Sequence, residues 1–178
     1  MALVKPHNRG LNLGCGSAYW PGYINADVVR QWPGYQPANV VCDARKPLPF
    51  RDGAFGTVYL GHLLQHIAQP YHADCLAEVY RILESPGILV VTEVDIDIVL
   101  PRYLSDPLDN DVGQLIWGEQ GKIHGEGLAE ADTHRWGFSE ASLRHVLETA
   151  GFKIGERTRL HGAAVYYECS IWATKEAA

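Results

Sequence analysis

Short apolar runs, separated by polar and glycine-rich segments, dominate the first half of the chain. They predict strands at residues 10–14, 23–27, 40–43, 54–60 and 88–94. The last of these is an almost unbroken apolar run, which is typical of a strand buried on both faces of a parallel sheet. Residues 73–83 instead place apolar side chains at helical spacing, inside a mostly helical stretch from 61 to 83 that is broken near Pro70.

The second half predicts helices at residues 97–104, 111–117 and 139–149, and Ser139 with its neighbours supplies capping residues for the last one. Residues 152–159 and 165–174 are expected to pair as an antiparallel hairpin. Strands that alternate with helices favour a parallel sheet with helices on both faces. We therefore expect a single α/β domain over residues 1–178. It should be a Rossmann-like three-layer sandwich, mostly parallel, with an antiparallel strand pair at the C-terminal edge.

A turn with two glycines follows the first predicted strand. Gly14 and Gly16 carry no side chains, so the backbone can approach a ligand closely there. In open α/β sheets, ligands sit just past the carboxyl ends of the strands. Only residues 17–26 separate this turn from Asp27, so the helix that normally crosses between the two strands is expected to shrink to about a turn. A tight turn without a ligand is the other interpretation of the two glycines alone.

A dinucleotide fingerprint would require a third glycine at the position of Tyr19 and an acidic residue about twenty residues further on. Asp27 comes too early for that pattern. A nicotinamide-dependent oxidoreductase is therefore a weaker alternative.

Composition narrows the function further. The chain has 178 residues, is 47% hydrophobic and 20% charged, and carries a formal net charge of −6 with no basic run, which argues against a nucleic-acid partner. Its four cysteines are scattered, as in proteins with reduced thiols. We find no apolar run long enough for a membrane span and no signal-peptide pattern, so we expect a cytoplasmic protein.

Six motifs follow one another along the chain. They are LNLGCG at 11–16, PGYINAD at 21–27, LPFRDGAF at 48–55, GHLLQHI at 61–67, EVYRILESPGIL at 78–89 and a late helix from WGFS at 136–139 to AGF at 150–152. In order and content these motifs resemble those of the class I S-adenosylmethionine-dependent methyltransferases, in particular compact members of the UbiE-like (type 11) branch with a shortened first helix. The resemblance covers residues 9–95 and 134–153.

The resemblance implies S-adenosyl-L-methionine as the cofactor. It implies that Asp27 accepts hydrogen bonds from the ribose hydroxyls and that Asp43 accepts one from the adenine amine. The glycines of the first turn would lie against the methionine end and the ribose. The complete implied set of cofactor-binding residues is Asn12, Gly14, Cys15, Gly16, Asp27, Asp43, Ala44, Gly61 and His62.

Methyl transfer is an in-line displacement, and much of its catalysis comes from positioning the nucleophile. A hydroxyl nucleophile also requires a base, commonly histidine. The candidates are His62, His66 and His134, with His124 in a glycine-rich loop, and each of them can also be a structural or surface histidine. His62 and His66 stand four residues apart, but no carboxylate or cysteine cluster accompanies them, so we expect no metal.

The acceptor is expected to be a small polar or sugar-type molecule, methylated at oxygen. After the fourth strand the chain lacks the Asn/Asp-Pro-Pro-Tyr/Phe motif of amino-group methyltransferases. Residues 96–135, which depart most from the family core and mix aromatic with polar side chains, are the expected substrate cover. The oligomeric state is left open. Four departures from the family pattern, at Asn12, Ala18, Gly56 and Gln65, support an alternative: a non-catalytic cofactor-binding or scaffold protein on the same fold.

Overall fold

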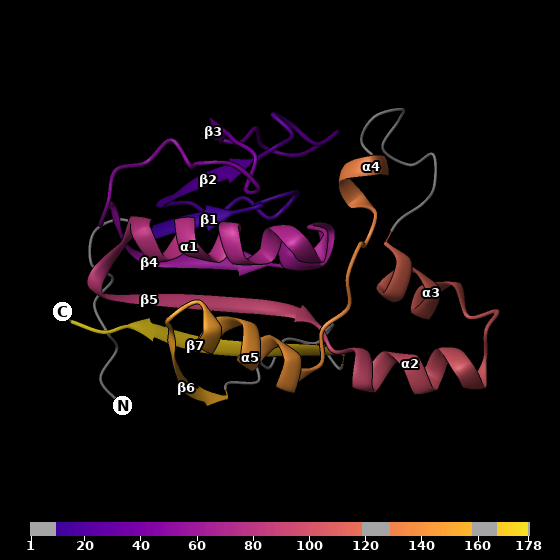
Figure 1. Ribbon diagram of the computed structural model, residues 1–178. Helices are drawn as coiled ribbons and strands as arrows, with labels where there is room; N and C mark the ends of the chain where they lie inside the picture. The colour runs from indigo at the N-terminus through magenta and orange to yellow at the C-terminus, as the bar shows by residue number, and fades with distance from the viewer. Residues whose placement is uncertain (1–9, 119–128, 158–166, 178) are drawn as a thin grey trace.

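The computed structural model describes residues 10–118, 129–157 and 167–177, and their centre is a seven-stranded sheet (Figure 1). Its strand order is β3-β2-β1-β4-β5-β7-β6. The first five strands in that order are parallel, whereas β7 pairs antiparallel with both β5 and β6. The strands are β1 Gly10–Leu13, β2 Tyr23–Asp27, β3 Val40–Val41, β4 Phe55–Gly61, β5 Leu83–Val94, β6 Lys153–Arg157 and β7 Glu168–Lys175.

This sheet confirms the predicted fold class, including the antiparallel pair at the C-terminal edge. The second strand has the predicted bounds, while β3 is shorter than predicted. The fifth strand begins at Leu83, five residues earlier than its apolar run suggests, because Leu83 still pairs with Phe55 across a register irregularity. Residues 158–166, which include the connection of the predicted hairpin, lie outside the described residues.

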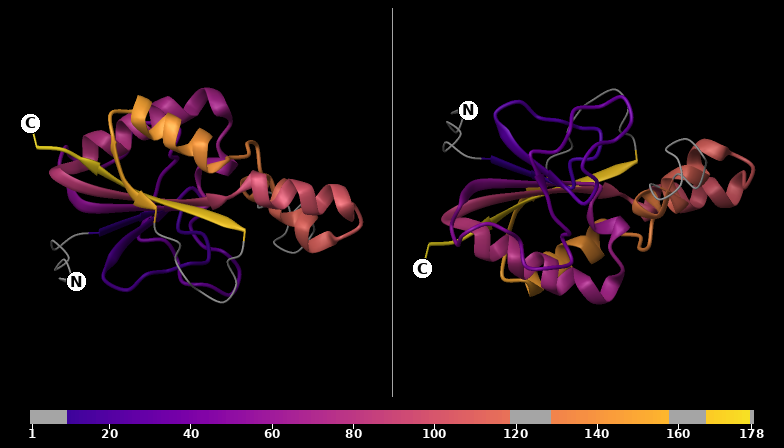
Figure 2. Two further views of the ribbon diagram at one scale, coloured as in Figure 1. Left: turned by 90° about the horizontal axis from the view of Figure 1, so that it is seen from below. Right: turned by 90° about the horizontal axis from the view of Figure 1, so that it is seen from above.

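Two helices cover one face of the sheet. They are α1 (His72–Ile82) and α5 (Glu140–Thr149), which lie side by side in Figure 2. Their buried side chains include Leu76 and Leu143, each no more than 1% exposed. Burying one such side chain contributes about 1.5–3 kcal/mol. The predicted cap of α5 is a reciprocal box, in which the side chains of Ser139 and Ser142 each accept from the other residue's backbone N–H.

Loops, rather than helices, lie over the opposite face of β1 and β2 (Figure 2). The connections at 14–22 and 28–39 contain no helix, so the predicted loss of the first crossing helix is confirmed. Helices were expected on both faces, but the described residues place α1 and α5 on one. On the other face, the ring of Trp20 stacks on Tyr59 of β4 at 4.4 Å between centroids. An aromatic pair thus packs where a helix would otherwise do so.

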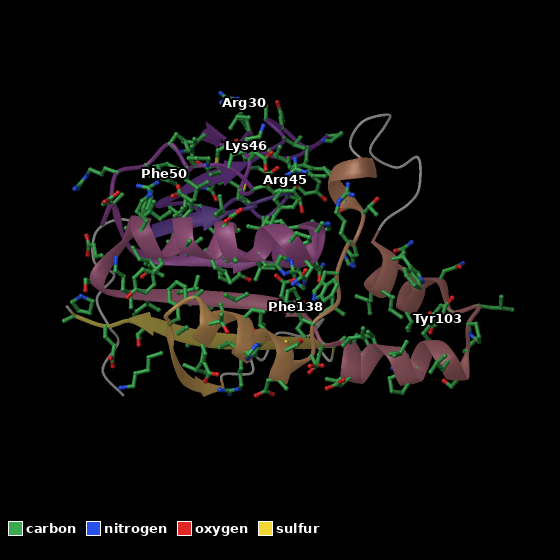
Figure 3. All side chains as sticks on the ribbon, in the orientation of Figure 1. Arg30, Arg45, Lys46, Phe50, Tyr103 and Phe138 are labelled. Carbon is green, nitrogen blue, oxygen red and sulfur yellow. The ribbon has the colours of Figure 1, made fainter. Side chains whose placement is uncertain are left out.

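A helical hairpin extends from the carboxyl end of β5. It consists of α2 (Ile96–Ser105) and α3 (Asn110–Trp117), which confirm two predicted helices, and Tyr103 points from α2 toward α3 (Figures 1 and 3). The short α4 (Ala129–Asp132) was not predicted. The chain then returns past the end of β4 (Figure 1) to Phe138, which is buried just ahead of α5 with its ring centroid 5.2 Å from that of His72. No helix in the described part is long and apolar enough to span a membrane.

Candidate active site

A cavity of about 870 Å³ opens at the carboxyl ends of β1, β2 and β4. Two 3-10 turns, η1 (Leu64–His66) and η2 (Gln69–Tyr71), follow β4 at this edge, in place of the start of a continuous helix. Eight of the nine residues expected around a cofactor line the cavity, and Asn12 does not. The lining side chains and backbone come from four parts of the chain: 13–18, 27–45, 61–67 and 131–135.

The turn after β1 is fixed by β2 and by a close neighbour. Ala26 O accepts from the backbone N–H groups of Gly14, at 2.8 Å, and Cys15, at 3.1 Å. Gly14 has φ +72°, and a Cβ there would lie 2.6 Å from Leu63 Cδ1. Only glycine meets both conditions without strain, so the turn can present bare backbone to the cavity.

Asp27 is buried at the centre of this edge, with 6% of its surface exposed. Its Oδ2 accepts from Gly16 N and its Oδ1 from Val29 N, each at 2.8 Å. These bonds fix the carboxylate plane, and each oxygen keeps a further lone pair for a ligand hydroxyl. Burial, with the Asp27 charge second, raises the pKa of the Cys15 and Cys42 thiols to about 11. Both thiols are therefore neutral at pH 7.

Asp43 lies on the β3 side of the cavity and is paired with Arg45. The guanidinium donates to both carboxylate oxygens, Nε at 2.9 Å and Nη2 at 2.8 Å, and Lys46 Nζ is 3.8 Å away (Figure 3 labels both cations). The hydrogen bond from Arg45 lowers the pKa of Asp43. Between the two acids, the cavity wall is partly apolar and includes Val28 and Tyr35, each about half exposed.

Asn12, which was expected to contact the cofactor, is not among the residues that line the cavity. It is 2% exposed, and its Nδ2 donates to Ala18 O at 2.7 Å and to Asn25 Oδ1 at 3.0 Å. Asn25 in turn bonds both backbone polar groups of Trp20. The two amides brace the loop at 17–22. A carboxylate at position 12 would face two acceptors, which explains the departure from an acidic residue.

His62 is the first residue after β4 and has φ +54°. Its N–H donates to Thr92 O at 2.7 Å, and its Nε2 lies 2.8 Å from Glu168 Oε1. Burial lowers the pKa of His62. The hydrogen bond to Glu168 and the charge of Glu93 outweigh burial, so the net pKa is raised. His62 thus lines the cavity as part of an ion pair with β7.

Glu93 is fully buried near the end of β5. Its Oε1 accepts from Leu64 N at 2.8 Å and its Oε2 from Gln65 N at 3.3 Å. Burial raises the pKa of Glu93 to about 7, although His62 and these two amides oppose the rise. Sequence reasoning missed this residue, although an acid inside an apolar strand is itself a signal. Glu168 gave no comparable signal, because its partner, His62, lies far away in sequence.

His66 also lines the cavity. Its Nδ1 lies 3.3 Å from Thr133 O, and because a carbonyl only accepts, Nδ1 carries the proton. Burial, followed by the nearby His134, lowers the pKa of His66 to about 4. The ring is therefore neutral at pH 7, with its lone pair on Nε2.

His134 lies behind His66, with ring centroids 4.7 Å apart, and is not among the cavity-lining residues. Its Nδ1 is 3.1 Å from Leu115 O and its Nε2 is 2.7 Å from Gln65 Nε2. Burial lowers its pKa. Both ring nitrogens are thus occupied by protein groups, which argues against His134 as the base.

The fourth candidate histidine, His124, lies outside the described residues. The described part of the chain brings together no group of three or more potential metal ligands.

Comparisons with known proteins agree with this arrangement. A family profile described as a methyltransferase domain matches residues 2–156. The chain belongs to the methyltransferase-domain family, and it is an S-adenosylmethionine-dependent enzyme with the class I fold. No curated protein matches the sequence at a significant level.

Solved structures share the fold at low identity. An S-adenosylmethionine-dependent methyltransferase from Methanosarcina mazei has a TM-score of 0.65 and 19% identity over 98% of this chain and 95% of its own. A Thermotoga maritima methyltransferase, described as a possible histamine N-methyltransferase, has a TM-score of 0.61 and 18% identity over 97% and 84%. The Burkholderia thailandensis 1,6-didemethyltoxoflavin-N1-methyltransferase, solved with that substrate and S-adenosylhomocysteine, has a TM-score of 0.62 and 14% identity over 94% and 71%.

Proposed function

We propose that this methyltransferase acts on a hydroxyl oxygen of a small polar or sugar-type acceptor, bound between His66 and the segment 131–135. The observation that carries the proposal is the state of His66: a neutral imidazole whose Nδ1 is held by Thr133 O and whose Nε2 lone pair is available. Such a nitrogen can accept a hydrogen bond from a hydroxyl and orient its oxygen. The net charge of −6 also disfavours nucleic-acid acceptors.

The cofactor would occupy the side of the cavity formed by β1, β2 and β3. Asp27 would accept from the ribose hydroxyls with its remaining lone pairs. Asp43 has Arg45 on both oxygens and would offer its last acceptor position to the adenine amine, while Ala44 would donate its backbone N–H to the ring. The backbone of residues 14–16 and Gly61, with His62 beside it, would contact the methionine end. This placement leaves residues 131–135 and His66 for the acceptor.

The bound cofactor would supply an electrophilic methyl group and would leave as neutral S-adenosylhomocysteine once that group is on the acceptor oxygen. His66 Nε2 would accept the hydrogen bond of the acceptor hydroxyl, orient its oxygen and take up its proton. Because the pKa of His66 is about 4, its base form predominates at neutral pH, and its main contribution is to align the hydroxyl.

A screen of hydroxyl, carboxyl and amine acceptors with methyl-labelled S-adenosylmethionine tests this proposal. The expected product is an O-methyl compound, and His66→Asn should lower kcat/KM by about 10²-fold, the usual cost of misplacing a reacting group. His145→Asn, on the exposed side of α5, is the matched control and should leave the rate unchanged. Methylation of amines alone would refute the oxygen acceptor. Cofactor binding without any methylated product would instead favour the non-catalytic alternative.

A further inference from the structure

Residues 133–136 are fastened to the turn after β4 by backbone and side-chain bonds. Gln65 O accepts from Arg135 N at 2.7 Å and from Trp136 N at 3.1 Å. On the next residue, His66 Nδ1 donates to Thr133 O, and the Gln65 side chain reaches His134. This contact region is where the chain passes from the helical hairpin back to the core (Figure 1). Arg135 in this stretch lines the cavity, as do Ala131 and Asp132 just before it.

The Gln65 amide can have only one orientation. Leu115 O accepts from His134 Nδ1, so Nδ1 carries the proton and Nε2 has a lone pair. The group 2.7 Å from that lone pair must be a donor, which places the Gln65 NH₂ there. Its Oε1 then accepts from Val94 N at 3.3 Å. A flipped Gln65 amide would place its oxygen against the lone pair of His134 Nε2 and its NH₂ against the backbone N–H of Val94.

A carboxylate at position 65 would not satisfy this pattern. Gln65 is 4% exposed and next to Glu93, which already supplies a buried acidic group at this point. A carboxylate would also face the His134 lone pair, and two acceptors 2.7 Å apart repel unless a proton is added. The titratable and charged groups around this contact are His66 on η1, His62 after β4, Glu93 on β5, Arg135 next to His134 and, beyond His62, Glu168 on β7. Of these, His62 lowers the pKa of His134 through its charge when it is protonated.

We propose that Gln65 is a positioning residue: its backbone carbonyl holds Arg135 N and Trp136 N, its side-chain amide donates to His134, and these bonds together latch residues 133–136 onto the end of β4 and hold the acceptor wall and the tautomer of His134. The donor end of the amide selects the neutral Nδ1–H form of His134, and the acceptor end secures β5. The latch itself follows from the contacts above. Its consequence for the acceptor rests on the proposed function.

Two variants and one control test the latch without knowledge of the acceptor. They are Gln65→Glu, which replaces the donor with an acceptor, Gln65→Leu, which removes both groups at similar volume, and Gln69→Leu, at an exposed glutamine on η2. Ring ¹⁵N spectra should show His134 of the natural protein as the neutral Nδ1–H tautomer at pH 7. In Gln65→Glu, the lone pair and the carboxylate share an added proton, so the His134 ring should titrate at higher pH. Gln69→Leu should match the natural protein.

Hydrogen exchange supplies the second readout. Gln65→Leu keeps the backbone carbonyl that accepts from Arg135 N and Trp136 N but loses the side-chain bond to His134, so the segment should open more often and these two amides should exchange at least tenfold faster than in Gln69→Leu. If Gln65→Leu does not fold, the spectra of Gln65→Glu still decide the question. An Nε2–H tautomer in the natural protein, or an unchanged His134 titration in Gln65→Glu, would overturn the latch.

These results do not depend on turnover, so failure of the oxygen-acceptor proposal leaves them interpretable. Where an acceptor is in hand, Gln65→Glu should raise its KM at least tenfold at pH 8 with a smaller change in kcat. Lowering the pH should restore KM, because the added proton completes the latch. A KM independent of pH in Gln65→Glu would contradict the effect on the acceptor.

Discussion

Three histidines near the cavity are equivalent in the sequence but have pKa values shifted in opposite directions in the structure. Glu168 and Glu93 raise the pKa of His62, whereas burial lowers the pKa values of His66 and His134. The difference depends on groups from β5, β7 and α3 that the sequence places far away. Local spacing could nominate these residues but could not assign their roles. Burial and distant partners decide which histidine has a raised pKa, which one lines the cavity and which one has both ring nitrogens bonded to protein groups.

The lowered pKa of His66 predicts a specific acid sensitivity. In the unfolded chain this histidine has its ordinary pKa of 6.5, whereas in the folded protein its pKa is about 4. Stability from this group is therefore complete above about pH 7 and is lost as the pH falls toward 4. Urea unfolding at pH 7.5 and 5.0 should show a smaller loss in His66→Asn than in the natural protein. Equal losses of unfolding free energy in the two proteins would contradict the neutral, buried state of the His66 ring.

Asn12 gives a second prediction at this scale. Asn12→Asp places a buried carboxylate against Ala18 O and Asn25 Oδ1, which are both acceptors. It should lower the free energy of unfolding by about 1–3 kcal/mol, the cost of an unsatisfied buried polar group. Asn110→Asp, on an exposed position of α3, should change it by no more than about 0.5 kcal/mol. If Asn12→Asp left the free energy of unfolding unchanged, the two amides would not brace the loop.

Among the secondary-structure elements, those with a clear apolar period were predictable. The strands at the centre of the sheet and the helices α1, α2, α3 and α5 follow their patterns. Two elements were misjudged from the sequence. The start of β5 depends on a tertiary contact, because Leu83 pairs with Phe55. The helix α4 is only four residues long, too short to show an apolar period. The helix-free face of β1 and β2 follows from short connections, which the sequence did indicate between the first two strands.

The turn between β1 and β2 carries the prediction at this scale. Gly14→Ala combines a positive φ with a Cβ only 2.6 Å from Leu63 Cδ1. Gly34→Ala is the matched control, because Gly34 also has a positive φ (+82°) but no neighbour within 4 Å. Backbone strain should cost each variant about 1–2 kcal/mol, and the contact should make Gly14→Ala the less stable by denaturant unfolding. Equal losses of stability in Gly14→Ala and Gly34→Ala would mean that the Leu63 side chain moves aside without cost.

For the whole molecule, the sequence predicted the cofactor side of the cavity better than the acceptor side. Gly14, Gly16 and Asp27 lie within or beside short motifs at one sheet edge, and a parallel sheet brings such edges together. The opposite wall comes from residues 131–135, which reach the cavity only because Gln65 and His66 hold the returning chain. No local pattern encodes that contact.

The central claim is that this cavity holds the cofactor through Asp27. Calorimetric titration with S-adenosylhomocysteine should show one site per chain, and Asp27→Ala should weaken binding by about 1.5–3 kcal/mol, roughly 10–150-fold, the usual contribution of hydrogen bonds to a charged group. Asp97→Ala, at an exposed position on α2, is the control and should bind as the natural protein does. Absence of binding by the folded natural protein, or equal affinity in Asp27→Ala, would contradict the claim.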